Sequence, residues 1–374
     1  MDIYQHTVLD HADVANINID FTPDVIFLFV SPTFPETQEF VDDLCAKFKK
    51  STIIGCSTAG EIIGNQVLDS SVALTAVKFK KTSFKVIDVD LTSHDLDCYK
   101  TGNTISERLM ADNLRHIFVL SDGLNVNGAE LVKGLQHNVD KNISITGGLA
   151  GDGPNFEKTF VIYNNKVHSK RIVALGLYGE DLKIGFGSKG GWDSFGIERL
   201  VTKSENNVLY ELDGKPALKL YKSFLGDKAK DLPGSGLLFP LSMRDEDNQT
   251  PVVRTILAVD EENQSLTFAG NIPQGSYVRL MKANIDRIIN GAEQSAMISN
   301  NSEDGHQLAF LISCVGRRLV MKQLVEEEVE AVNDVLGTGI FTTGFYSYGE
   351  IAPFDEFSPC SLHNQTMTIT TFSE

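Results

Sequence analysis

The sequence contains an internal repeat, and this repeat constrains the fold more than any other feature. Residues 25–61 align with residues 116–152 at a constant offset of 91 positions and without a gap. Nine of the 37 aligned pairs are identical, whereas about two identities are expected from ordinary residue frequencies. The two segments are therefore predicted to be copies of one structural unit.

Each copy has the pattern of a strand, a helix and a second strand. An apolar run, Val25–Val30 or Ile117–Leu120, precedes apolar residues at helical spacing and a short strand that runs into glycine. Such a crossover joins parallel strands, so both glycine turns are expected at one carboxyl edge of a sheet. Open α/β sheets bind ligands at that edge.

A third copy is predicted near the C-terminus, with a longer connection. Phe310–Cys314 is an apolar strand and Val325–Leu336 an amphipathic helix, while Gly344–Ile351 repeats the glycines, acid and isoleucine of Gly55–Ile62. The three copies end in glycine-plus-acid turns that are expected to line one binding site. These turns are Ala59-Gly60-Glu61, Ala150-Gly151-Asp152 and Tyr348-Gly349-Glu350.

The remainder of the chain is predicted to be rich in short strands. The segment Glu205–Gly226 is predicted to be helical, and a domain boundary is placed near residue 205. The predicted fold class is α/β with α+β elements: repeated β-α-β units with mixed sheets, in domains at residues 1–205 and 206–374.

Composition argues against several classes of partner. The formal net charge of −17 disfavours nucleic acid and anionic membranes. The N-terminus lacks a basic start and an apolar stretch, so neither a signal peptide nor a membrane span is expected, and the predicted location is cytoplasmic. Five scattered cysteines without a C-x-x-C pair are expected to be reduced.

Sequence motifs give little support to an enzyme. No G-x-x-x-x-G-K-[ST] sequence occurs, and Gly185–Gly190 fits G-x-G-x-x-G but is not followed by a helical pattern. Around Ser57 the G-x-S-x-G pattern fails because Ala59 holds the last glycine position. Cys56 and Cys314 are interpreted as core or pocket-wall thiols, since no histidine adjoins them in sequence.

Several stretches resemble the FIST family, the paired N- and C-terminal sensory domains of F-box and intracellular signal transduction proteins. The resemblance covers nearly the entire chain. The stretches that carry it are Gly55–Ile62, Gly147–Gly153, Gly191-Trp192, Leu200–Thr202, Val208–Leu218, Ser313–Arg317, Gly344–Pro353 and His363–Met367.

The resemblance implies a sensory protein that binds a small ligand. Because FIST_N-like and FIST_C-like halves together occupy the chain, it is expected to stand alone and act on a separate histidine kinase or cyclic-di-GMP enzyme. No catalytic activity is expected. A subset of the family is described as haem-binding nitric-oxide sensors, so the resemblance also raises haem as a cofactor.

The candidate ligand site combines the three turns with aromatic side chains and the C-terminal tail. Its acids favour an amine-bearing ligand such as an amino acid, whose carboxylate the turn amides would bind. Haem would instead need an apolar slot and an axial ligand, for which His363 is the candidate. A less favoured alternative is catalysis by the clustered acids. The candidate residues are Cys56, Ser57, Thr58, Gly60, Glu61, Gly148, Gly151, Asp152, Trp192, Tyr346, Tyr348, Glu350, His363 and Asn364.

Overall fold

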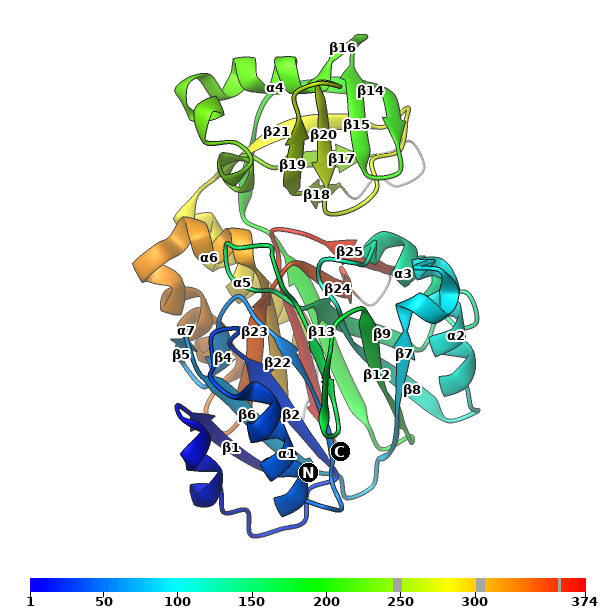
Figure 1. The fold of residues 1–374 in the computed structure, drawn as a ribbon, viewed down its shortest axis with the longest axis vertical. Coiled ribbons are helices and arrows are strands. Elements are labelled where there is room, and N and C mark those ends of the chain that lie inside the picture. The colour runs from blue at the N-terminus through cyan, green and yellow to red at the C-terminus, as the bar shows by residue number, and fades with distance from the viewer. Residues whose placement is uncertain (245–250, 301–306, 356–357) are drawn as a thin grey trace.

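Three six-stranded sheets with their helices form the larger part of the molecule, here called the body, and a smaller domain lies above them (Figure 1). The computed structural model describes residues 1–244, 251–300, 307–355 and 358–374. In these ranges no helix is long and apolar enough to cross a membrane.

The body consists of three copies of one unit. The first contains β1 (Asp2–Val8), η1 (His11–Asn16), β2 (Val25–Val30), α1 (Thr37–Lys47), β3 (Thr52–Ser57), β4 (Glu61–Ile63), β5 (Gln66–Leu68) and β6 (Val72–Lys78). The second contains β7 (Ser83–Asp90), η2 (Leu91–His94), α2 (Cys98–Leu109), β8 (Leu114–Ser121), α3 (Gly128–Gln136), β9 (Ser144–Leu149), β10 (Val161–Tyr163), β11 (Lys166–His168) and β12 (Arg171–Tyr178). The third contains β13 (Lys183–Lys189), α5 (Ile285–Ser299), β22 (Leu308–Cys314), α6 (Val315–Met321), η5 (Lys322–Leu324), α7 (Val325–Leu336), β23 (Phe341–Ser347), β24 (Gly349–Pro353), β25 (Cys360–His363) and β26 (Met367–Ser373).

Each unit contains the predicted β-α-β crossover. The pairs β2 and β3, β8 and β9, and β22 and β23 are parallel, and a helix connects the strands of each pair. The apolar run of β2 is buried along its whole length because layers cover both of its faces. The prediction of three such units in an α/β fold with mixed sheets is confirmed.

The units are interlocked by an exchange of hairpins. After its parallel pair, each copy sends its next two strands into another copy's sheet: β4 pairs with β23, β10 with β3, and β24 with β9. The exchange forms a closed cycle, so no sheet is made from one copy alone. The glycine turns mark the points where the chain crosses between sheets.

The gap-free alignment of the first two copies is wrong from the second strand onward. Leu28 lies opposite Gly55 in the first copy, whereas Val119 lies opposite Gly147 in the second. The first strands thus keep the offset of 91, but β9 is shifted by one further residue because the connection after α3 is longer. Sequence identity alone did not reveal this slip because glycines adjoin at 147 and 148.

Three phenylalanines at equivalent positions meet where the three sheets face one another. Phe27, Phe118 and Phe310 lie on β2, β8 and β22, and their ring centroids are 4.7–6.0 Å apart. All three side chains are buried. Aromatic contacts in this range add to the stability gained from burial, so this triad defines the axis around which the copies pack.

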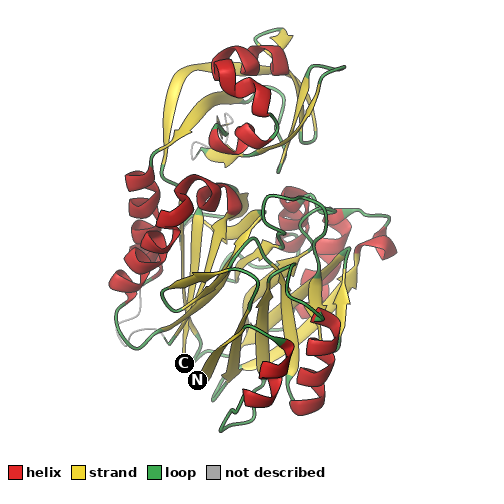
Figure 2. Cartoon of the chain, turned by 60° about the vertical axis from the view of Figure 1, so that its left-hand side comes forward, coloured by secondary structure: helices red, strands yellow, loops and turns green. Residues whose placement is uncertain are grey.

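A further domain is inserted into the third copy, between β13 and α5. It contains β14 (Trp192–Glu205), β15 (Val208–Leu212), β16 (Lys215–Pro216), α4 (Ala217–Leu225), η3 (Gly226–Asp231), η4 (Gly234–Leu238), β17 (Leu241–Arg244), β18 (Val252–Arg254), β19 (Ile256–Asp260), β20 (Ser265–Phe268) and β21 (Tyr277–Ala283). Residues 192–283 are here called the inserted domain, which Figure 2 shows above the sheets. Residue 205, the sequence-based boundary, ends β14 within it.

The prediction of one helix over Glu205–Gly226 is wrong in its first half. Val208–Leu212 forms strand β15, and only Ala217–Leu225 is helical. Asp213 and Gly214 have φ angles of 50° and 71° in the turn after β15. An Asp-Gly pair with positive φ at both residues is a strong hairpin signal, and it overrides the helical spacing of the apolar residues.

Replacing a member of the phenylalanine triad should strongly destabilise the body. Phe310→Ala removes a buried ring from between two others, so the free energy of unfolding is expected to fall by about 3–5 kcal/mol. Denaturant titration measures this loss. Phe341→Ala on β23 is the control, because that ring is 40% exposed and its loss should cost much less. Equal effects of the two substitutions would refute the role of the triad.

Candidate functional site

The three glycine turns lie against one another at the crossing points. Ala59 donates its N–H to Tyr346 O and Tyr346 donates its own to Gly60 O, both at 2.8 Å. Gly151 donates to Ser57 O at 3.0 Å. The structure therefore brings the predicted turns together, but these amides bind neighbouring turns and do not point at a ligand.

Glu61 is buried and hydrogen-bonded to hydroxyls of its own copy. Its carboxyl oxygens accept hydrogen bonds from Thr58 Oγ1 and, at 2.8 Å, from Ser71 Oγ. Burial raises the pKa of Glu61 to about 7, against the opposing effect of these bonds.

Glu350 is the equivalent acid in the third copy and has equivalent partners. It accepts hydrogen bonds from Ser347 Oγ at 2.7 Å and from Thr366 Oγ1 at 3.0 Å. Burial raises the pKa of Glu350 to about 8. With this pKa, the Glu350 carboxyl is largely protonated near neutral pH. The prediction that the turn acids form an anionic lining for an amine is therefore not met at Glu350.

Asp152 is not equivalent to these acids. The connection from β9 to β10 in the second copy is longer than the connection from β3 to β4 in the first. As a result Val161, which pairs with Cys56, holds the position that Glu61 holds when it pairs with Phe345, and the second copy has valine in place of the acid. Asp152 instead accepts hydrogen bonds from the Tyr348 hydroxyl and from three backbone N–H groups. These N–H groups belong to Phe156, Glu157 and Lys158 at 2.7–2.9 Å. Asp152 thus holds its own loop.

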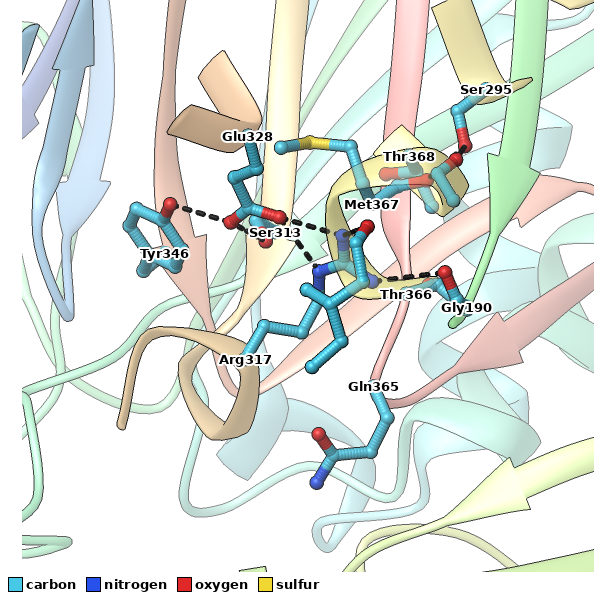
Figure 3. A network of polar contacts seen from close by, with 12 residues as sticks. Gly190, Ser295, Ser313, Arg317, Glu328, Tyr346, Gln365, Thr366, Met367 and Thr368 are labelled. Atoms are coloured by element: carbon cyan, nitrogen blue, oxygen red, sulfur yellow. Dashed lines mark hydrogen bonds and ion pairs between the residues drawn. The ribbon is translucent and has the colours of Figure 1, made fainter. Parts of the chain in front are cut away.

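A buried ion pair occupies the third copy (Figure 3). Arg317 binds Glu328 through Nε at 3.0 Å and Nη2 at 2.6 Å, and the Tyr346 hydroxyl donates to the same carboxylate. Arg317 also donates to the carbonyls of Gly190 and Ile288. These carbonyls lie on the chain segments that enter and leave the inserted domain, so the ion pair fixes its attachment.

The inserted domain contacts the turn His363–Thr366 that joins β25 to β26. Gln365 Nε2 donates to Leu237 O at 3.2 Å and to Thr255 Oγ1 at 3.0 Å. Trp192 Nε1 donates to Gln365 O at 3.0 Å. Figure 3 shows the Gln365 amide directed away from the Arg317 network. The contact between this turn and the inserted domain is here called the seam.

A buried arginine strengthens the seam. Arg254 Nη1 donates to Leu362 O at 3.0 Å, and burial lowers the pKa of Arg254 to about 10. Further out, Asn271 of the inserted domain accepts a hydrogen bond from Asn127 at 2.8 Å and donates one to Glu130 at 2.6 Å. The seam is therefore polar and rests on both the second and the third copies.

Two amide oxygens of the turn His363–Thr366 have no hydrogen-bond partner among the described residues. The Asn364 amide nitrogen donates to Tyr348 O of the body at 3.5 Å, whereas the Gln365 amide nitrogen donates to the inserted domain. Asn364 Oδ1 and Gln365 Oε1 are both buried and unpaired in the part of the chain that the structure describes. Such groups are uncommon in native proteins, and each costs about 1–3 kcal/mol. The Gln365 amide is also tightly held, since a Cβ on Gly316 would lie 2.4 Å from its nitrogen.

The left-handed backbone of Gln365 belongs to the repeat. Its φ angle is 64°, and Ser70 and Lys170, which hold the same position in the other copies, have φ angles of 54° and 55°. This position lies two residues before the first residue at which β6 pairs with β2, β12 with β8, and β26 with β22. In the third copy this turn contacts the inserted domain, through the hydrogen bonds of Gln365 to Leu237 and Thr255.

His363 does not fit an axial haem ligand in this arrangement. It is buried, and Nε2 donates to Ala352 O at 2.7 Å while the ring packs edge-on against Phe354. Burial lowers the pKa of His363 to about 4. Among the described residues, no three His, Cys, Asp or Glu side chains come together as a metal site.

The remaining predicted site residues belong to the core of the sheets. Burial raises the pKa of the Cys56 thiol well above its usual range, which disfavours a nucleophilic role. Gly148 packs against Ile312 and Phe345, and Ser57 Oγ accepts a hydrogen bond from Phe160 N at 3.1 Å.

The sequence analysis missed three seam residues, Gln365, Arg254 and Thr255. Gln365 adjoins the candidates His363 and Asn364, so the tail motif could have indicated it. Arg254 and Thr255 are far away in sequence, and only the placement of the inserted domain reveals them.

The comparisons with known proteins identify the family. Residues 24–215 match the FIST N domain and residues 217–353 match the FIST C domain. The chain therefore belongs to the FIST family, whose domains sense small ligands in signal transduction. The two matches meet inside the inserted domain, so the family boundary does not coincide with the three structural copies.

An uncharacterized protein of Methanocaldococcus jannaschii is 26% identical over 336 residues, which cover 82% of this chain and 63% of that protein. The chain thus spans less than two thirds of the length of this relative. A cyanuric acid hydrolase from A. caulinodans aligns with 9% identity and a TM-score of 0.36, covering 99% of this chain and 98% of the other. A chorismatase aligns with 8% identity and a TM-score of 0.34, covering 100% and 98%.

The buried acids should make stability depend on pH. A carboxyl whose pKa rises from 4.5 to about 8 on folding, as for Glu350, binds its proton more tightly in the folded state. Its stabilising effect is complete below pH 4.5 and is lost as pH rises through 8. Glu350→Gln should therefore gain stability relative to wild type between pH 5 and pH 8, as measured by urea unfolding. A difference that does not change with pH would contradict this.

Haem should give no absorption band that depends on His363. Its Nε2 is engaged by Ala352 O, so the spectrum of wild type with added haem should match that of His363→Ala. Circular dichroism confirms that the variant is folded. A stoichiometric Soret band in wild type that the folded variant lacks would overturn this prediction.

Proposed function

We propose that this protein senses a small ligand with N–H donors, an amine or amino acid, that binds at the seam and changes the placement of the inserted domain. The observation that carries the proposal is the pair of unpartnered oxygens on Asn364 and Gln365. A ligand that donates hydrogen bonds to them would remove the cost of leaving them unpaired.

The charges around the seam define the ligand class further. Two amide oxygens accept hydrogen bonds and therefore favour ammonium or amide N–H groups. Glu350 lies beside the same turn and is bonded to Thr366. If it ionises when the seam opens to water, it would add attraction for a cation, whereas Arg254 could bind a carboxylate. An amino acid offers both groups.

A change in domain placement would carry the signal. Only two chain segments join the inserted domain to the body, at Gly190–Trp192 and Ala283–Asn284. The two oxygens are inaccessible in the arrangement described, so ligand entry requires the inserted domain to move. A ligand that binds one placement better than the other shifts the population between them, which is the physical basis of a sensor.

The partner is proposed from the family. A separate histidine kinase or cyclic-di-GMP enzyme would recognise the inserted domain in one of its placements. The proposal involves no catalytic step, since the acids of the turns bind hydroxyls and amides of their own loops.

Amino acids and amines should stabilise the protein against heat through the seam. A ligand at 100 times its Kd stabilises the folded state by about 2.7 kcal/mol, which differential scanning fluorimetry of a panel detects as a rise in Tm. The rise should disappear in Asn364→Ala and Gln365→Ala, which remove the accepting oxygens.

Two matched controls come from the first copy. Ser70→Ala changes the position equivalent to Gln365, and Glu61→Gln changes the acid equivalent to Glu350; both lie outside the seam and should retain the rise in Tm. If no member of the panel stabilises wild type, or if the control variants lose the effect equally, the proposal is wrong.

A further inference from the structure

A groove of about 990 Å³ opens where the third copy meets the second. One side is β13, the edge strand of its sheet. The other side is formed by the starts of β8 and β9, the end of β24 and the start of β25. The glycine turns lie at the opposite end of β9, and none of the residues that line the groove takes part in the seam.

The charged residues of the groove lie on its rim and select neither a cation nor an anion. Arg115 and Lys141 are exposed there, and so are Asp140 and Glu180, so two positive and two negative charges balance. Lys183 also lines the rim and is engaged in an interaction of its own. An ion would gain no net attraction at this rim to offset its loss of hydration, whereas an uncharged molecule has no such loss.

The inner surface of the groove is apolar on both sides. Ile143, Ile145 and Cys360 are buried side chains of the second copy's side, and Cys360 Sγ donates to Ile145 O at 3.3 Å. Leu182 and Phe186 line the opposite side, where Phe186 on β13 is half-buried. The volume lies within the range typical of sites for small organic molecules, and an apolar lining of this kind rewards the burial of apolar surface.

A histidine next to the groove adds no charge to it. His116 Nδ1 lies 2.7 Å from the Oγ of Ser144, which lines the groove, and Nε2 lies 3.1 Å from Thr146 Oγ1. The ring is fully buried, and burial lowers the pKa of His116 to about 3. The start of β9 therefore presents a hydroxyl and no cation.

The repeat shows what distinguishes this place from its equivalent in the first copy. Through the pairing of their strands with those of the phenylalanine triad, the residues that hold equivalent positions on β1, β7 and β13 are Gln5, Val86 and Phe186. Gln5 Nε2 reaches from the first copy to the third and donates to Thr342 O at 2.9 Å.

Thr342 is in turn equivalent to Ile145, because each precedes the residue that pairs with the triad phenylalanine of its copy. The first copy thus closes the gap to its neighbour with a hydrogen bond across these two positions. Phe186 has no group that can donate such a bond. At the same place, the third copy therefore presents an aromatic ring on one side of the groove and Ile145 on the other.

We propose that this groove is a second binding site, independent of the seam, for an uncharged aromatic molecule. Its rings lie between Phe186 on one side and Ile145 and Cys360 on the other. Burial of the rings supplies most of the affinity, and the contact with the Phe186 ring adds to it. The balanced rim supplies the preference for an uncharged molecule over an ion of the same shape.

Fluorescence titration with N-phenyl-1-naphthylamine tests the proposal, because this uncharged compound becomes fluorescent in apolar surroundings. Wild type should bind one molecule, and at least ten times more tightly than it binds 8-anilino-1-naphthalenesulfonate, which has the same rings and a sulfonate that must lose water. Phe186→Gln should bind the uncharged compound at least ten times more weakly. This variant is expected to fold, because the first copy has glutamine at the equivalent position, and circular dichroism checks it.

Val86→Gln is the matched control, because Val86 holds the equivalent position in the second copy, is also half-buried and does not line the groove. It should bind the uncharged compound like wild type. Asn364→Ala should do the same, which separates this site from the seam. Absence of binding to wild type, binding of the sulfonate as tight as that of the uncharged compound, or an equal loss in Val86→Gln or Asn364→Ala would each overturn the proposal.

Discussion

The structure depends on the closed exchange of hairpins among three equivalent units. Because β4, β10 and β24 each complete a sheet that belongs to another copy, no copy can satisfy its backbone hydrogen bonds alone. The packing of Phe27, Phe118 and Phe310 at the axis provides the apolar burial that holds the three sheets together. The glycine turns are therefore structural parts of the body, because their amides and acids make hydrogen bonds within it.

The exchange of hairpins explains why the sequence predicted the individual β-α-β units but not the way they combine. The β-α-β units were visible because buried strands such as Val25–Val30 and amphipathic helices such as Val325–Leu336 have periods that burial imposes. The meeting of the turns followed from the parallel crossovers. The exchange of hairpins was not visible, because three-residue strands such as β4 and β10 carry no period, and their partners lie in other copies.

The candidate site could be predicted only in part. Glu61 and Glu350 were recognised as related, but their burial and hydroxyl partners depend on sheets that close around them. Asp152 was misaligned because the second copy has a longer connection between β9 and β10, which places Val161 at the equivalent position. The seam could not be predicted, because it forms only when residues 192–283 are placed against the turn His363–Thr366. The sequence around Arg254 has no local pattern that indicates its hydrogen bond to Leu362 O. The spacing of apolar residues thus predicts the β-α-β units. Which polar groups remain without a hydrogen-bond partner depends on how the three copies and the inserted domain pack together.

The place of the inserted domain has a consequence for how such proteins can diverge. Trp192 and Ala283 face each other as paired residues at its base, so the chain leaves the body and returns to it at neighbouring points. A domain attached in this way can lengthen, shrink or change its surface while the ring of three sheets keeps its packing. Recognition of ligands and partners can therefore vary on a constant frame, provided that the turn His363–Thr366 retains a surface on which the domain can rest.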